Sequence, residues 1–420
     1  SFLLLLSIGT PVAWSITISS LFTLLVSVPF LPALTTISQR MATGIDSFAL
    51  LAIPFFILSG ELMNKGGVAH RLVAFAKSLV GFLPGGLALI NVISAMLMGS
   101  VAGSAMASAS AMGSILGPEM EKEGYSKGFG VAINITSATT GLVIPPSNIL
   151  IVYSLASGGA SIAALFLAGY IPGILTGLFL MAVAMIWAKK KNFKTGKRAP
   201  LKTVFNSFVR AFPSLMLLFV VIGGIVSGVF TATEASAIAV IYTLVLGFVY
   251  KEITVKTLPS ILLKSSTTTA IVMFLIGASM SMSWVLSYEN IPEMISSGIL
   301  SLSDNKIVIL LLINFTLLFV GIFMDMTPAV LIFTPIFLPI VTQLGIDPVH
   351  FGIIMILNLC IGLCTPPVGS VLFVGVGVAN TSIQKVIKPL IPLFLAMIVA
   401  LLLVTYIPAL SLWLPSIFGL

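Results

Sequence analysis

The chain has 420 residues, of which 58% are hydrophobic and 8% are charged, and its formal net charge is +8. A soluble domain of this length does not need so much apolar surface, so the composition excludes an ordinary soluble globular protein. Apolar runs of about 20 residues recur from end to end, which predicts an all-α polytopic membrane protein.

The N-terminal segment, residues 1–39, carries no charge, and Arg40 is the first charged residue. A secretory signal peptide normally opens with a basic region, which is absent here. We therefore expect this segment to form a first membrane span. Because Ser1 is not an initiator methionine, we also expect at least one residue to precede it.

Two basic segments, 65–77 and 251–264, are expected to form amphipathic helices in the membrane interface. In the first, Lys65, Arg71 and Lys77 recur at helical spacing beside an apolar face. Such a pattern is typical of helices that lie on a bilayer. These helices would brace a rigid frame, and His70 would be an interfacial side chain.

Residues 99–114 include 13 glycines, alanines and serines among 16 positions. One interpretation is a close contact between helices, which small residues permit. The other is a re-entrant hairpin that enters the membrane, turns and leaves on the same side. The acidic residues that follow Pro118 come too soon for a further complete span, which favours the hairpin.

Two double prolines, Pro145–Pro146 and Pro366–Pro367, lie 221 residues apart in similar apolar segments. Each removes two amide donors and frees carbonyls one turn earlier. In hydrocarbon such a break survives only where protein or a polar cavity satisfies the freed groups. Matching broken helices in two halves of a chain indicate the central site of a transporter.

A basic stretch divides the chain almost in half and is expected to be a cytoplasmic linker. It holds eight of the 20 lysines and arginines: Lys189, Lys190, Lys191, Lys194, Lys197, Arg198, Lys202 and Arg210. No aromatic residues interleave with them usefully, so nucleic-acid binding is a poor alternative. We predict a first repeat over 1–190, a linker over 191–210 and a second repeat over 211–420. With both termini outside, each repeat crosses an odd number of times, which gives inverted topology.

Asp325 is the most informative charged residue, because it lies deep in an apolar run, where function is the default interpretation. The offset of 221 places it opposite Ser104. Its carboxylate could ligate a cation, cap the helix that starts near Pro328, or do both. Glu234 is a second candidate, with a helix-capping role as the alternative.

Hydroxyl, amide and carbonyl oxygens around the double prolines suit sodium, which is a hard cation. The helix N-termini that follow the prolines point positive dipole ends toward an anion. No arginine lies in either half of this site, so carboxylate binding would rest on amides, hydroxyls and dipoles. The alternative is that the hydroxyls only join helices. The predicted substrate-binding residues are Thr139, Thr140, Pro145, Pro146, Ser147, Pro366, Pro367 and Gly369.

Over its whole length the chain resembles the large membrane subunit of tripartite ATP-independent periplasmic (TRAP) transporters. The resemblance rests on the hairpin ending Ile115–Pro118, on both double prolines, and on the segments Phe230–Ala235, Gly321–Asp325 and Gly345–Gly352. It implies an elevator, with a scaffold and a mobile transport domain that holds two hairpins and two broken helices. It also implies sodium sites at Ser100, Gly103, Ser104 and Asn148 and at Asp325, Thr327 and Thr365.

The resemblance further implies sodium-driven import of an organic acid across a bacterial inner membrane, with no cofactor other than the coupling ion. A periplasmic substrate-binding protein would deliver the acid, of the C4-dicarboxylate or sialic-acid class, and the hairpin sequence is closest to sialic-acid carriers. A small four-helix membrane subunit is expected as a separate chain, because 39 uncharged N-terminal residues leave no room for a fused one.

Three other functions remain open at this point. A self-contained sodium/dicarboxylate carrier would have a similar architecture and need no binding protein. An intramembrane protease would need a serine beside a base, yet His70 and His350 both look interfacial, or two buried aspartates, of which only Asp325 qualifies. A channel would not explain two matched broken helices. We therefore do not expect an enzyme.

Overall fold

The computed structural model describes residues 2–191, 193, 196, 198–302 and 305–420. Within these ranges the chain forms twenty α-helices, one short 3-10 helix and no strand. Two lysines of the predicted basic linker, Lys194 and Lys197, lie outside the described residues.

Eight described helices are long and apolar enough to cross a membrane, which confirms the predicted all-α polytopic class. They are η1 with α4 (Phe48–Lys65), α10 (Ile162–Lys190), α11 (Leu201–Val226), α12 (Ala232–Val249), α13 (Leu258–Tyr288), α15 (Lys306–Phe323), α16 (Met326–Gln343) and α19 (Ile383–Tyr406).

Helix boundaries in the two halves recur at the spacing of the double prolines. The starts of α7 (Ala105–Lys122), α8 (Lys127–Thr140) and α10 each precede the starts of α16, α17 (Pro348–Gly362) and α19 by 221 residues. Each half therefore presents a hairpin, a broken helix and a long helix in the same order.

Both hairpins are present as pairs of helices joined by a tight turn. α6 (Gly86–Ala102) turns into α7 at Gly103, whose φ of 60° lies in the left-handed region that glycine adopts without strain. α15 turns into α16 at Met324 and Asp325. The small residues of the first hairpin also permit close packing, because a Cβ added at Gly99 would lie 2.9 Å from the Cα of Gly141.

The broken helices form the most enclosed part of the molecule. α8 is followed by α9 (Asn148–Ala156), and α17 is followed by α18 (Ser370–Val378). Every residue from His350 to Gly362 in α17 is buried, and so is every residue of α8 after Lys127 except Gly130. Helices that are enclosed on all sides in this way read as apolar around their whole circumference.

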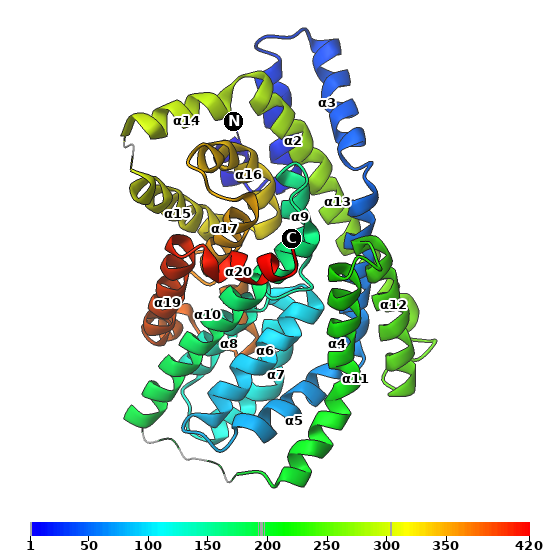
Figure 1. Ribbon diagram of the computed structural model, residues 1–420, viewed down its shortest axis with the longest axis vertical. Helices are drawn as coiled ribbons and strands as arrows, with labels where there is room; N and C mark the ends of the chain where they lie inside the picture. The colour runs from blue at the N-terminus through cyan, green and yellow to red at the C-terminus, as the bar shows by residue number, and fades with distance from the viewer. Residues whose placement is uncertain (1, 192, 194–195, 197, 303–304) are drawn as a thin grey trace.

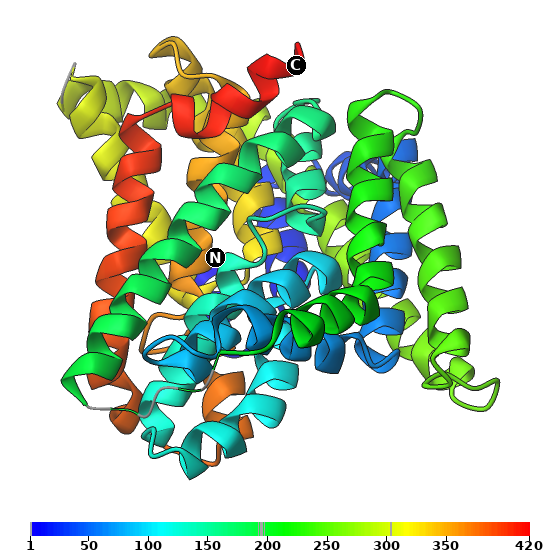
Figure 2. The same ribbon diagram turned by 60° about the horizontal axis from the view of Figure 1, so that its bottom comes forward.

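The arrangement brings the two hairpins toward the middle from opposite ends. α5 to α8 gather at one end, and α14 to α17 gather at the other (Figures 1 and 2). α10, α19 and the short α20 (Ala409–Ile417) run along one side, while α4, α11, α12 and α13 stand on the other.

One of the two predicted interfacial helices is wrong. α5 (Val68–Val80) forms within the first predicted segment, and its counterpart at the repeat spacing is α14 (Ile291–Leu302). The second predicted segment, 251–264, instead runs into α13, a span of 31 residues. Lys264 is the only charged residue in α13, so the apolar segment continues through it.

The predicted first span is also wrong in form. Residues 2–44 fold as α1 (Phe2–Ser7), α2 (Val12–Leu24) and α3 (Phe30–Gly44), of which the longest has 15 residues. Pro11 and Pro29 stand immediately before α2 and α3. Proline removes a donor and clashes with the preceding turn, so it divides this apolar stretch into short helices.

Candidate functional site

A cavity of about 470 Å³ lies where both hairpin tips meet two helices from the other side of the molecule. The hairpin tips contribute Gly103, Ser104, Asp325 and Thr327. The opposite wall is formed by one face of α4 and one face of α13. Clefts with an apolar lining and a few convergent polar groups are the usual form of a small-molecule site.

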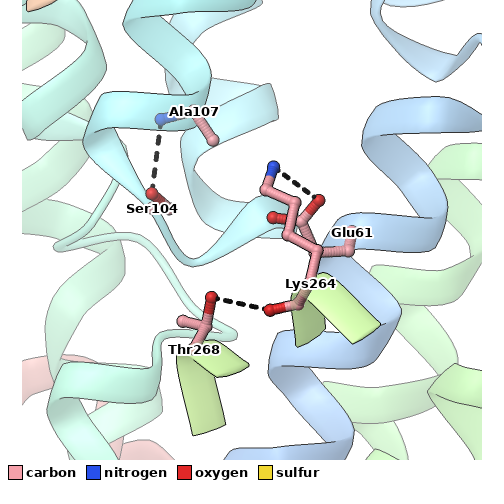
Figure 3. Close-up of polar contacts among 5 residues, drawn as sticks. All are labelled: Glu61, Ser104, Ala107, Lys264 and Thr268. Carbon is pink, nitrogen blue, oxygen red and sulfur yellow. Dashed lines mark hydrogen bonds and ion pairs between the residues drawn. The ribbon is translucent and has the colours of Figure 1, made fainter. Parts of the chain in front are cut away.

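The two hairpin tips are equivalent in position and different in chemistry. Ser104 is the N-cap residue of α7, and its Oγ accepts a hydrogen bond from the backbone N–H of Ala107 at 3.3 Å (Figure 3). Asp325 is the N-cap residue of α16, but its side chain makes no capping hydrogen bond. Its carboxylate lines the cavity instead. The structure therefore places Asp325 at the cap position without the capping bond.

Five of the seven predicted sodium-site residues line this one cavity: Gly103, Ser104, Asn148, Asp325 and Thr327. Asn148 packs directly on the first turn, because a Cβ added at Gly103 would lie 2.8 Å from Asn148 Nδ2. The donors are hydroxyl, amide and carboxylate oxygens, which fit a hard cation. Among the described residues no group of three His, Cys, Asp or Glu side chains is placed to hold a transition metal.

The other two predicted sodium-site residues do not line the cavity. Ser100 is fully buried and donates to the carbonyl of Leu97 at 2.9 Å. Thr365 donates to the carbonyl of Ile361 at 2.7 Å. Both hydroxyls are therefore used within their own helical turns.

The predicted substrate-binding threonines lie in a buried seam between the two broken helices. Thr139 and Thr140 are fully buried and donate to the carbonyl of Thr136 at 3.1 and 2.8 Å. Thr139 also lies 3.2 Å from Cys364 Sγ, and Cys360 Sγ donates to the Thr139 carbonyl at 3.1 Å. The two cysteines are buried, as the sequence predicted, and they join α17 to α8.

The remaining predicted residues surround the two helix breaks. Both Pro145–Pro146 and Pro366–Pro367 are cis peptide bonds. The Gly369 N–H donates to the carbonyl of Ile322 at 3.1 Å, which fastens the second break to α15. The Ser147 hydroxyl is buried and has no hydrogen-bond partner among the described residues.

Two charged residues of the cavity wall were missed by the sequence analysis. Lys264 Nζ lies 2.9 Å from Glu61 Oε2, and both side chains line the cavity (Figure 3). The expectation that no cationic side chain lies near the site is therefore wrong. Lys264, Thr268 and Val272 recur every four residues, as do Ile53, Ile57 and Glu61, and this spacing puts each set on one helix face.

The comparison with known protein families decides the class. The family described as "Tripartite ATP-independent periplasmic transporter, DctM component" matches residues 1–410. The chain belongs to this family. It is therefore a multi-pass inner-membrane protein of a transporter family, and the family is not one of enzymes.

Three relatives illustrate the range of this DctM family. "Uncharacterized protein YgiK" of Salmonella typhimurium is 57% identical over 100% of the chain and 96% of that protein. The "Isethionate TRAP transporter permease protein DctMQ" of Oleidesulfovibrio alaskensis is 41% identical over 98% of the chain and 65% of that protein. The "C4-dicarboxylate TRAP transporter large permease protein DctM" of Pseudomonas aeruginosa is 40% identical over 89% of the chain and 88% of that protein.

Solved structures agree on the fold of this DctM-family chain. The YdaH transporter of Alcanivorax borkumensis aligns with a TM-score of 0.67 at 15% identity, over 93% of the chain and 90% of that protein. MtrF of Neisseria gonorrhoeae aligns with a TM-score of 0.61 at 12% identity, over 89% of the chain and 84% of that protein. Both are membrane transporters, and at these identities the likeness concerns the fold alone.

Two further candidates from the sequence have structural roles in this DctM-family chain. Glu234 forms a capping box with Thr231, with backbone N to Oε2 at 2.8 Å and Oγ1 to backbone N at 3.2 Å. His350 is not interfacial but buried, with Nδ1 3.1 Å from Ser411 Oγ. Neither His350 nor Ser411 lines the cavity, so this serine–histidine contact gives no support to a protease.

Proposed function

We propose that this TRAP large permease subunit couples sodium entry to uptake of an organic acid delivered by a periplasmic binding protein. The observation that carries the proposal is the shared cavity, in which both hairpin tips and the start of α9 bring oxygen donors together. A sodium ion and an anionic substrate stabilise each other when they bind side by side in such a low-dielectric site.

Sodium coupling is supported by the contrast between donors at the two tips. Ser104 and Asn148 provide neutral oxygens, while Asp325 provides the one carboxylate at a hairpin tip. An ionisable residue at membrane depth is costly unless a partner compensates it, and a bound cation would do so.

An elevator movement is supported by the division of the cavity walls. One wall comes from the hairpins and broken helices, which pack on one another, and the other comes from α4 and α13. We propose that the first group moves as the transport domain against a scaffold that includes α4 and α13. The two repeats, 1–190 and 211–420, would then have the inverted topology common among secondary transporters.

The proposed partners are a separate small four-helix membrane subunit and a soluble periplasmic binding protein. The proposed substrate is a small organic acid of the C4-dicarboxylate or sialic-acid class. Relatives named for isethionate and for C4-dicarboxylates are 41% and 40% identical to this chain, so overall identity does not select one acid.

Reconstitution tests this proposal. The chain and its small subunit, in proteoliposomes with an inward sodium gradient, should take up labelled acid only when the cognate binding protein is added. Replacement of sodium by potassium, or of the cognate binding protein by an unrelated one, should abolish uptake. Robust uptake by the membrane subunits alone would favour the self-contained carrier instead.

A further inference from the structure

The ion pair between Glu61 and Lys264 belongs to the α4–α13 wall of the cavity, not to the hairpins. The two residues are 203 positions apart, and their charged groups lie 2.9 Å apart. The Glu61 side chain is 14% exposed, whereas the Lys264 side chain is 61% exposed. An ammonium group has three donors, so Lys264 retains donors for a second partner in the cavity.

Helix packing does not account for this pair. An ion pair that remains open to water adds little to stability, because solvent screens the attraction and both side chains lose freedom. Lys264 is the only charge in the 31 residues of α13, and charges within membrane spans are costly and mostly functional. An uncharged pair would join α4 to α13 at lower cost.

The charge balance of the cavity indicates what the lysine binds. Its charged lining residues are Glu61, Asp325 and Lys264, two carboxylates and one ammonium. An entering organic anion meets two like charges, and Lys264 is the one lining cation that can offset them. The Thr268 hydroxyl donates to the Lys264 carbonyl at 3.0 Å, so its proton is not available to an anion (Figure 3).

Ser104 offers a second donor on the opposite wall. Its Oγ accepts the capping bond from Ala107 at 3.3 Å, which leaves its own proton free to donate. An acid group held between the Lys264 ammonium and the Ser104 hydroxyl would touch both walls of the cavity. Charge-assisted hydrogen bonds of this kind are the strong ones in recognition of carboxylates.

We propose that Lys264 binds the acid group of the substrate and that Glu61 is the carboxylate that occupies Lys264 while the cavity is empty. Substrate binding exchanges one carboxylate for another on the same ammonium, with no transfer of protons or electrons. The inference rests on the proposed function, because it takes the transported molecule to be an organic anion.

The proposal predicts that breaking the pair from its two sides has opposite effects. Lys264→Gln should raise the KM for uptake at least about tenfold, because the binding charge is lost. Glu61→Gln should lower the KM, because the internal competitor is lost. Lys264→Arg should retain part of the affinity. Lys256→Gln, which removes a positive charge from the exposed loop before α13, is the matched control and should leave the KM unchanged.

The measurement is sodium-driven uptake of succinate and of N-acetylneuraminate by the reconstituted complex with its binding protein. A pair that only joins helices would make Lys264→Gln and Glu61→Gln change the KM in the same direction, and that result would overturn the proposal. So would an unchanged KM in Lys264→Gln. Loss of sodium or binding-protein dependence in the unmodified complex would count against the proposed function instead, because the KM ratios are read within one assay.

Chemical rescue covers the case in which Lys264→Gln fails to fold. The chain has only two cysteines, Cys360 and Cys364, and both are buried, so the background of thiol labelling is low. Lys264→Cys treated with 2-aminoethyl methanethiosulfonate regains an ammonium of nearly lysine length, and its KM should return toward the original value. The neutral ethyl reagent should give no rescue, and equal rescue by both reagents would overturn the proposal.

Discussion

The two hairpin tips share a backbone design but present different chemistry to the cavity. Ser104 and Asp325 both stand at the N-cap of the second arm, in α7 and α16. The serine oxygen accepts its helix's amide, whereas the aspartate leaves its carboxylate directed to the cavity without a capping bond. A repeated fold thus holds one neutral tip and one charged tip, and any cation-dependent step must depend more on the second half.

The two helix breaks differ in the same sense. Pro145 and Pro146 are buried, whereas Pro366 is half-buried and Pro367 is exposed. Helix α10 approaches the first break closely, because a Cβ at Gly173 would collide with Ile144. The first break is therefore enclosed by a neighbouring helix, and the second is more open to its surroundings. Four predictions test how far the halves are equivalent.

The largest effect is expected when either double proline is removed. Pro145→Ala with Pro146→Ala should let α8 continue toward α9, restore two amide donors and occupy the free carbonyls, so uptake should be almost abolished. Pro366→Ala with Pro367→Ala should act alike if the breaks have equivalent functions. Uptake by reconstituted protein is the measurement, and near-normal transport in either variant would contradict a broken-helix site in that half.

The next effect separates the two tips. Asp325→Asn keeps the shape of the side chain and removes its charge, so half-maximal uptake should need at least about tenfold more sodium, equivalent to about 1.4 kcal/mol of sodium binding. The measurement is uptake against sodium concentration. Asp46→Asn, at an exposed position away from the cavity, is the control. Unchanged sodium activation in the Asp325 variant would leave it only a position at the helix end.

A smaller effect concerns the glycine contacts that press each hairpin onto its broken helix. A Cβ at Gly362 would lie 2.5 Å from the Cα of Gly321, and one at Gly141 would lie 2.8 Å from the Cα of Gly99. Both contacts are backbone to backbone and cannot relax by a rotamer change. Gly362→Ala and Gly141→Ala should each destabilise the protein by about 1–3 kcal/mol, with Gly362→Ala the more severe.

Thermal unfolding in detergent checks this pair of substitutions. Gly130→Ala in α8 is the matched control, because its added Cβ would meet only Met120 at 3.9 Å. Alanine also favours a helix over glycine, so this control should be neutral or slightly stabilising. Equal melting temperatures for the control and the two variants would show that the hairpins do not depend on these contacts.

The smallest effect is expected at the neutral tip. Ser104→Ala removes the cap of α7 and should lower the free energy of unfolding by about 1 kcal/mol. Ser126 caps α8 in the same way, accepting from Phe129 N at 3.3 Å, and Ser126→Ala should cost a similar amount. A Ser104→Ala loss far above that of Ser126→Ala would show that the neutral tip carries more than a helix cap.

Much of the fold could be predicted from local sequence features. Apolar content and run length determine a helical membrane protein, because hydrocarbon requires each span to satisfy its own backbone. The double prolines and their spacing of 221 residues predicted both breaks, and the small residues of 99–114 predicted the first hairpin. These signals are local because they arise from missing amides, missing side chains and helical periodicity.

Tertiary structure alone decided which polar groups share the cavity. The spacing of Glu61 and of Lys264 shows which neighbours share their helix face, but not that residues 203 positions apart meet as an ion pair. In the same way, Thr139 and Thr140 carry hydroxyls suited to a site, yet the packing of α8 on α17 turns Thr139 toward Cys364. Helical periodicity determines which side chains lie on one face, and only the packing of helices determines what that face contacts.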